Sequence, residues 1–142
     1  MVGTQDAAYR LKVAAGFLVE ARQDVSLERW RSAVDNAQLA VENAAKAVLA
    51  LVKPVGRSHN PAVQLRGALD EGLFAASDRE RVQRLAELAE TLGSDIHIQT
   101  DYGDEMEGRT PWELFDRADG NQALGIAEVA VELAQTIVGS SQ

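Results

Sequence analysis

The chain has 142 residues, no cysteine, and a net charge of −8 from 14 basic and 22 acidic side chains. Its length fits one domain, residues 1–142, and the lack of cysteine excludes thiolate metal sites and a cysteine nucleophile. The acidic surface disfavours broad, sequence-independent binding to nucleic-acid backbones, although a local basic pocket is compatible with it.

The N-terminal residues do not show the basic segment and apolar run that are typical of a secretory signal. The most apolar stretch, Ala44 to Val52, contains Lys46 and is far shorter than the ~20 residues that span a bilayer. We therefore expect a cytoplasmic protein without a membrane-spanning segment.

Apolar residues at helical spacing predict a first helix at about residues 6–22, followed by a short connection at 23–25. A long central helix is predicted from Ser26, as N-cap, to Val52. Its apolar residues from Leu27 to Leu51 alternate at spacings of three and four, which is a heptad seam. A second stripe on this helix is made of small residues: Ala33, Ala37, Ala40, Ala44 and Ala47. Two apolar faces indicate neighbours on both sides, as at the centre of a bundle.

Pro54 and Gly56 are expected to end the central helix. A short helix is predicted to begin at Pro61, with Asn60 as its cap. Its inner face would carry three leucines: Leu65, Leu69 and Leu73. A capping box at residues 77–80 predicts the next helix, which would run to Leu92 with Gly93 as its C-cap.

Residues 93–116 are predicted to form a long, mostly irregular segment with one helical turn at Thr110 and Pro111. The last helix is predicted at residues 117–138. The short connections favour antiparallel neighbours. We therefore predict an all-α, up-and-down bundle of four main antiparallel helices with one or two short helices.

Metal and cofactor chemistry is not supported by the residue pattern. The only histidines are His59 and His97, and neither follows a glutamate three positions earlier, as di-metal helical bundles require. The acidic residues at 101–107 lack EF-hand spacing, and no glycine-rich phosphate-binding motif is found. The sequence therefore predicts no metal, no cofactor and no assigned catalytic residue.

The polar face of the central helix gives the most specific candidate site. Gln38, Glu42 and Lys46 are four residues apart, so they stand in one row, and Glu42 is placed to pair with Lys46. An exposed charge ladder would show the same spacing. Because apolar residues flank this row on both sides, we expect Glu42 and Lys46 to be less exposed than such a ladder would be.

Two further pairs are candidate ligand-binding residues. Arg57 and His59 follow the central helix and could hold a phosphate, although His59 could equally cap or pack at a turn. Asp101 and Tyr102 lie in the long segment, where Tyr102 could stack on a base or attach the segment to the bundle.

The segment Ala37–Val48, AQLAVENAAKAV, resembles the central helix of HEPN domains, which are small helical bundles found alone or beside minimal nucleotidyltransferases. His59-Asn60-Pro61 is similar to the "His-Asp-Leu" segment that opens the next helix of that family, and residues 100–104, TDYGD, are similar to its "Thr-Arg-Tyr-Pro-Asp" loop. Residues 118–127 resemble its last helix, so the likeness covers about residues 5–138.

The resemblance implies a homodimeric helical module linked to nucleotide or RNA biology, with a nucleotidyltransferase partner of the toxin–antitoxin type. Many HEPN proteins are toxin-type ribonucleases with an Arg-x(4–6)-His motif. Here the positions that would hold the arginine carry Glu90, Thr91 and Leu92 before His97, and Val52, Lys53 and Pro54 before His59. Asp101 also stands where the family loop has arginine. These departures argue against nuclease activity.

Three functions therefore remain open. The first is a non-catalytic HEPN dimer that binds a nucleotide or a partner protein. The second is a ribonuclease toxin with a rearranged site that uses Arg57, His59 and Tyr102, since only histidine titrates near neutrality without a shift. The third is a dimerisation module without a ligand, for which the apolar seams alone would account.

Overall fold

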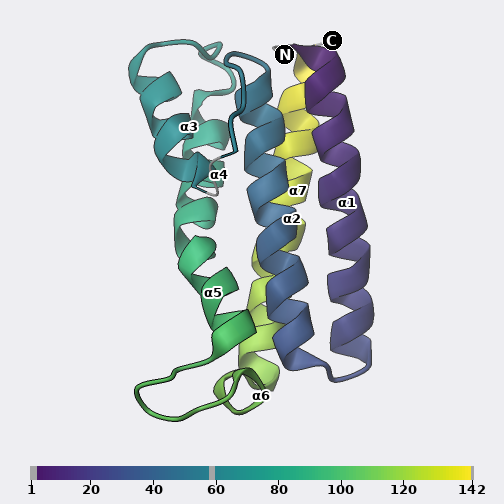
Figure 1. Ribbon diagram of the computed structural model, residues 1–142. Helices are drawn as coiled ribbons and strands as arrows, with labels where there is room; N and C mark the ends of the chain where they lie inside the picture. Colours follow the sequence, from purple (N-terminus) through teal and green to yellow (C-terminus); the bar gives the residue numbers. More distant parts are fainter. Residues whose placement is uncertain (1–2, 58–59, 142) are drawn as a thin grey trace.

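The computed structural model describes residues 3–57 and 60–141, and their regular structure is helical apart from one isolated bridge between Asp104 and Arg109 (Figure 1). The helices are α1 (Thr4–Ser26), α2 (Trp30–Ala50), α3 (Pro61–Asp70), α4 (Arg79–Thr91), α5 (Ser94–Tyr102), α6 (Pro111–Leu114) and α7 (Arg117–Ser140). The predicted all-α class is confirmed.

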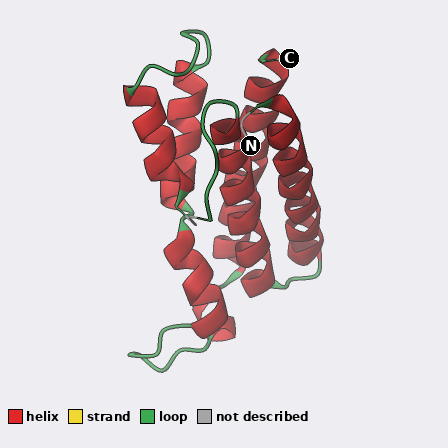
Figure 2. Cartoon of the chain, turned by 45° about the horizontal axis from the view of Figure 1, so that its top comes forward, coloured by secondary structure: helices red, strands yellow, loops and turns green. Residues whose placement is uncertain are grey.

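The three long helices α1, α2 and α7 lie side by side and form one half of the bundle (Figures 1 and 2). The pair α3 and α4 packs on the other side of α2. Helix α5 follows α4 in roughly the same direction and leads toward the short helix α6. The chain starts and ends at the same end of the bundle, where the Gly3 amide donates to the Ala50 carbonyl at 2.8 Å.

Helix α2 occupies the centre, as its two apolar stripes predict. It contacts every other helix of the described chain. The five residues of the alanine stripe, Ala33 to Ala47, have no exposed surface, and Val34, Val41 and Val48 of the heptad seam are buried as well. Small side chains allow the backbones of the flanking helices to approach closely, so α2 is enclosed from both sides.

The boundary between the first two helices differs from the prediction. Helix α1 continues through residues 23–25 to Ser26, whose hydroxyl donates to the Gln23 carbonyl at 2.7 Å. Ser26 is therefore not the cap of α2, which begins at Trp30. The chain reverses at Glu28, which has a φ of 56°, and the Arg29 amide closes the turn on the Asp24 carbonyl at 2.8 Å. This turn leaves Leu27 outside the seam, half-exposed to solvent.

Two predictions for residues 77–116 were also wrong. The expected capping box does not form: α4 is capped at Asp78, whose carboxylate instead accepts from Ser140 on α7 at 3.3 Å. Gly93 is the N-cap of α5 rather than the C-cap of α4, and residues 94–102 are helical. Only Thr100 of α5 is buried, so this helix lacks the apolar periodicity that would have revealed it.

Polar caps define the last two helices. The Thr110 hydroxyl accepts from the Glu113 amide at the start of α6, as predicted from the Thr-Pro pair. Asp116 begins α7 with a reciprocal capping box: its side chain accepts from the Asp119 amide at 3.0 Å, and the Asp119 side chain accepts from the Asp116 amide at 2.9 Å. Hydrogen bonding by the Asp119 amide, with the Asp119 side chain as a second cause, lowers the pKa of Asp116 below its ordinary value.

This cap predicts a pH-dependent effect on stability. A carboxyl whose pKa is lowered by folding stabilises the fold above its ordinary pKa, and that contribution disappears as the pH falls through the lowered value. We expect Asp116→Ala to lower the melting temperature at neutral pH, with the difference from wild type shrinking below about pH 4. Melting curves from pH 7 to pH 2 measure it, and a difference independent of pH would contradict the capping role.

Helix α7 is the one described helix long and apolar enough to cross a membrane on length and composition. The core helix of a bundle passes the same test. Here Ala123, Ala127, Ala130, Ala134 and Ile137 form a buried face, and α7 packs against α1, α2 and α4. Packing in the bundle accounts for this buried face of α7.

Candidate functional site

The polar row on α2 is buried, as predicted. Gln38, Glu42 and Lys46 are 1%, 5% and 8% exposed. The Lys46 ammonium donates to Glu42 Oε2 at 3.1 Å, and the Gln38 amide lies 3.5 Å from Glu42 Oε1. These three groups are removed from water and paired with one another, whereas an exposed ladder would leave them solvated.

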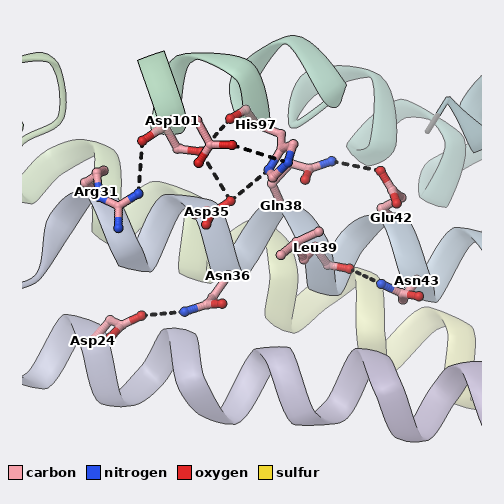
Figure 3. A network of polar contacts seen from close by, with 11 residues as sticks. Asp24, Arg31, Asp35, Asn36, Gln38, Leu39, Glu42, Asn43, His97 and Asp101 are labelled. Carbon is pink, nitrogen blue, oxygen red and sulfur yellow. Dashed lines mark hydrogen bonds and ion pairs between the residues drawn. The ribbon is translucent and has the colours of Figure 1, made fainter. Parts of the chain in front are cut away.

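Gln38 and Glu42 lie on the side of α2 that faces the second group of helices, opposite the side that packs on α1 (Figure 3). Lys46 follows Glu42 by one helical turn on the same face. Toward the start of α2 the row continues through Asp35 and Arg31, at the same helical spacing of three or four residues. The buried row is thus one end of a longer line of polar residues on α2, from Arg31 to Lys46, which we call the polar seam. It lies between α2 and the helices α3, α4 and α5, which form the second layer of the bundle.

A histidine on α5 meets this seam. His97 Nδ1 lies 2.9 Å from Asp35 Oδ1, and because a carboxylate only accepts, Nδ1 carries the proton. The Thr100 hydroxyl lies 3.2 Å from the same Asp35 oxygen and donates at 2.6 Å to the His97 carbonyl. His97 Nε2 faces Asp101 at 3.8 Å (Figure 3). The imidazole is therefore oriented between two carboxylates.

Arg31 lies at the end of the seam nearest the start of α2 and links the neighbouring helices there. Its guanidinium donates to the Thr100 carbonyl at 3.0 Å and lies 5.4 Å from the centre of the Trp112 ring of α6. Through these contacts Arg31 joins α2 to both α5 and α6, so its guanidinium helps to hold these helices together.

The structure separates the seven predicted site residues into different places. Asp101 and Tyr102 lie at the Arg31 end of the seam, which is about 16 Å along α2 from Glu42 at ~1.5 Å per residue. Tyr102 is 65% exposed, so it does not attach its segment to the bundle core. Arg57 is exposed in the connection from α2 to α3. The prediction for His59 lies outside the described residues.

Asp35, Arg31 and His97 are polar-seam residues that the sequence did not single out. Asp35 and Arg31 extend the Gln38–Lys46 row backwards by one helical turn each, which is a signal available in the sequence. The role of His97 had no such signal, because its segment was not recognised as a helix. Only the packing of α5 on α2 brings it to Asp35, 62 residues away in the chain.

The seam carries nearly balanced charge. Lys46 is paired with Glu42, and His97 with Asp35. Gln38 Oε1 is buried with no hydrogen-bond partner in the parts of the chain described by the structure. No group of three or more His, Asp and Glu side chains suited to a metal ion occurs among those residues. The seam can hold polar groups in fixed positions. Lys46 is occupied by a carboxylate, whereas Arg31 donates to a backbone carbonyl.

The sequence matches the profile of the HEPN domain family over residues 7–137. The chain belongs to the HEPN domain family. A search of curated proteins gave no match. Among solved structures, the chain is similar to the crystal structure of TT1696 from Thermus thermophilus, with 19% sequence identity, coverage of 92% of this chain and 96% of that one, and a TM-score of 0.66. At this identity the likeness establishes the shared fold alone.

Proposed function

We propose that this protein is a non-catalytic HEPN module that forms a homodimer and docks on a partner protein, a minimal nucleotidyltransferase of a toxin–antitoxin pair. The observation that carries the proposal is the internal pairing of the polar seam. Its buried Glu42 and Lys46 are paired with each other, and no arginine stands at the family's ribonuclease spacing before His97. Such a pairing stabilises a scaffold and leaves the buried Lys46 ammonium occupied by a carboxylate rather than open to an RNA phosphate.

The outer face of α5 and the loop after it supply the docking surface in this proposal. Ile98, Tyr102 and Met106 are 59%, 65% and 99% exposed and line one side of an open groove of about 460 Å³. Asp104 and Glu105 line the same groove. Exposed apolar side chains bordered by charge are typical of a protein–protein contact surface.

The loop that carries this surface has a fixed shape. Asp104 and Arg109 exchange two backbone hydrogen bonds at 2.8 and 2.9 Å. Gly103 has a φ of 70°, and a Cβ placed on it would lie 2.3 Å from the Arg109 carbonyl oxygen. Only glycine fits this approach. Ile98 and Tyr102 are therefore presented on a helix and Met106 on a closed loop, which reduces the entropy that docking would cost.

Substitution of one tyrosine tests the docking surface. The chain's two tyrosines form a matched pair, since Tyr102 on α5 is 65% exposed and Tyr9 on α1 is 64% exposed. We expect Tyr102→Asp to abolish a complex with a minimal nucleotidyltransferase encoded in the same genome, while Tyr9→Asp retains it. Gel filtration with light scattering measures the complex, and the protein alone should elute at twice 15.3 kDa. Equal binding by both variants, or no complex with wild type, contradicts the proposal.

A nucleotide is the alternative ligand implied by family membership. A phosphate-bearing ligand needs cations without carboxylate partners. Lys46 is paired with Glu42 and therefore does not favour a nucleotide at the buried row. Cations without such partners lie at the start of α2 instead.

RNA cleavage is a second candidate, favoured by the position of His97. Its Nδ1 is held by Asp35, so the half-exposed imidazole has the fixed tautomer that a general base requires. Arg31 lies on the same seam and could meet a phosphate. Cleavage of RNA by the purified wild type, lost in His97→Ala, would support this function against the docking proposal. A wild type without activity would exclude it.

A further inference from the structure

A pocket of about 460 Å³ lies where the turn between α1 and α2 meets α6. Three aromatic rings line it together with two guanidinium side chains: those of Trp30, Trp112 and Phe115, and of Arg29 and Arg31. Sites for small molecules typically enclose about 300–1,000 Å³ and combine aromatic walls with a few polar groups. By size and lining, this pocket is therefore suited to a small ligand.

One wall of the pocket packs closely against the last helix. Gly120 of α7 approaches the Trp30 ring so closely that a Cβ on this glycine would lie 2.7 Å from Trp30 Cε3. The Arg117 guanidinium lies 5.0 Å from the centre of the same ring. A ring held by these contacts is in place before a ligand arrives, which lowers the entropy that binding would cost.

The positive charge of the pocket is small. Arg29 has no ion-pair partner among the residues that the structure describes. The Arg31 guanidinium donates to the Thr100 carbonyl at 3.0 Å, so part of its hydrogen-bonding capacity is used. The carboxylate in the wall, Glu28, is paired with Arg117. From the described residues, the pocket thus offers one unpaired guanidinium and part of a second.

We propose that this pocket binds a small aromatic carboxylic acid. The ring of the ligand would stack on the indole of Trp112, which is 72% exposed. Its carboxylate would accept from Arg29, because a planar guanidinium matches the two oxygens of a carboxylate. One planar ligand would then use both the aromatic and the cationic wall of the pocket.

The charge of the pocket favours a carboxylate over a phosphate ester. A carboxylate carries one negative charge, which the Arg29 guanidinium balances. A phosphate monoester carries about 1.5–2 negative charges at neutral pH. The additional charge would meet only the shared Arg31 and would face the Glu28 carboxylate in the same wall.

The inference goes beyond the docking function and does not depend on it. It uses Arg29 and Trp112, whereas docking uses Tyr102 and its neighbours. A failed complex leaves binding of the acid intact, and a failed titration leaves the complex intact, so the two proposals can be rejected separately.

Tryptophan fluorescence measures this site directly, because both tryptophans of the chain line the pocket. The probe is hydrocinnamate, a phenyl ring on a short carboxylate chain, and we expect it to change the emission of the wild type saturably at millimolar concentration. Its neutral amide keeps the ring but lacks the charge, and propionate keeps the charge but lacks the ring. Each should bind at least about tenfold more weakly than hydrocinnamate.

Substitutions assign the two contacts. Arg29→Ala should weaken binding of hydrocinnamate about tenfold, by loss of one charge-assisted hydrogen bond, and should leave binding of the amide unchanged. Trp112→Leu should weaken it about threefold to tenfold through loss of stacking, measured by calorimetry. Arg84→Ala is the matched control, because Arg84 is an exposed arginine on α4 that does not line the pocket. It should bind as tightly as wild type, and circular dichroism should show all variants folded.

Four outcomes would overturn the proposal. Equal binding of hydrocinnamate and its amide, or unchanged binding by Arg29→Ala, removes the carboxylate contact. Absence of a saturable signal up to millimolar concentration removes the site. N-acetylphenylalanine places the same ring and carboxylate at a chain terminus, so binding more than about tenfold tighter than that of hydrocinnamate would assign the pocket to a polypeptide end. Tighter binding of AMP than of hydrocinnamate would assign it to a phosphate ester.

Discussion

Glu42→Ala should destabilise the fold by about 3–5 kcal/mol, because it leaves the Lys46 ammonium buried without its carboxylate. The side chains of the pair are only 6% and 10% exposed, so water does not replace the lost partner. The Gln38 amide also loses its contact to Glu42. Native domains are stable by only about 5–15 kcal/mol, so the loss would be plain in chemical unfolding. Urea titration of wild type and variant measures it.

A double variant separates pairing from burial. Replacing both charges, as in Glu42→Leu with Lys46→Met, removes the unpaired charge and should recover most of the stability lost by Glu42→Leu alone. The exposed pair Arg66–Glu90, joined at 2.6 Å with both side chains near half exposure, is the surface control. Glu90→Ala should cost less than about 1 kcal/mol. A loss as small as this in Glu42→Ala would show that the row is solvated after all.

Leu85→Ala should cost about 2–5 kcal/mol, since Leu85 lies in the apolar core and its truncation opens a cavity there. Leu85 has no exposed surface, whereas Leu88, one turn further along α4, is only partly buried. Leu88→Ala is therefore the matched control and should lose less than half as much. Both losses are measured as changes in the free energy of unfolding in urea. The slope of that free energy against urea concentration should be the same in both variants as in wild type.

The Leu85 experiment also tests whether α3 and α4 unfold together with the other helices. If α3 and α4 unfold independently of the α1–α2–α7 half, the Leu85 variant would show two transitions. A single transition at lower urea concentration would show one cooperative unit. Equal losses from Leu85→Ala and Leu88→Ala would contradict the observed difference in their burial.

Periodicity was most informative where a helix buries a continuous apolar face. Helix α2 shows this, since every alanine of its stripe is fully buried. Periodicity failed for α5, which buries only Thr100 and is held by polar contacts to α2. Helix ends were also misplaced where a turn, rather than a side-chain cap, decides the boundary. At Ser26 the reversal depends on the left-handed backbone of Glu28, which the residue type does not predict.

The candidate site also contains some contacts that local spacing predicts and others that it does not. The row of Gln38, Glu42 and Lys46 follows from helical spacing on one element, and its burial followed from the apolar residues on both sides. The contact of His97 with Asp35 joins two helices, so no local pattern contains it. The same holds for the pocket between Trp30 and Trp112, which are 82 positions apart by numbering (112 − 30).

Four features follow from the amino-acid pattern alone: the all-α class, the central position of α2, the paired row on its polar face and membership of the HEPN family. These depend on local periodicity and on residue types in order along the chain. Three other features emerge only when the helices pack: which polar groups meet across helices, which arginines have no carboxylate partner among the described residues, and which apolar side chains stay exposed. Those features depend on how α5 and α6 pack against α2, and that packing arises from many weak contacts spread over the whole bundle.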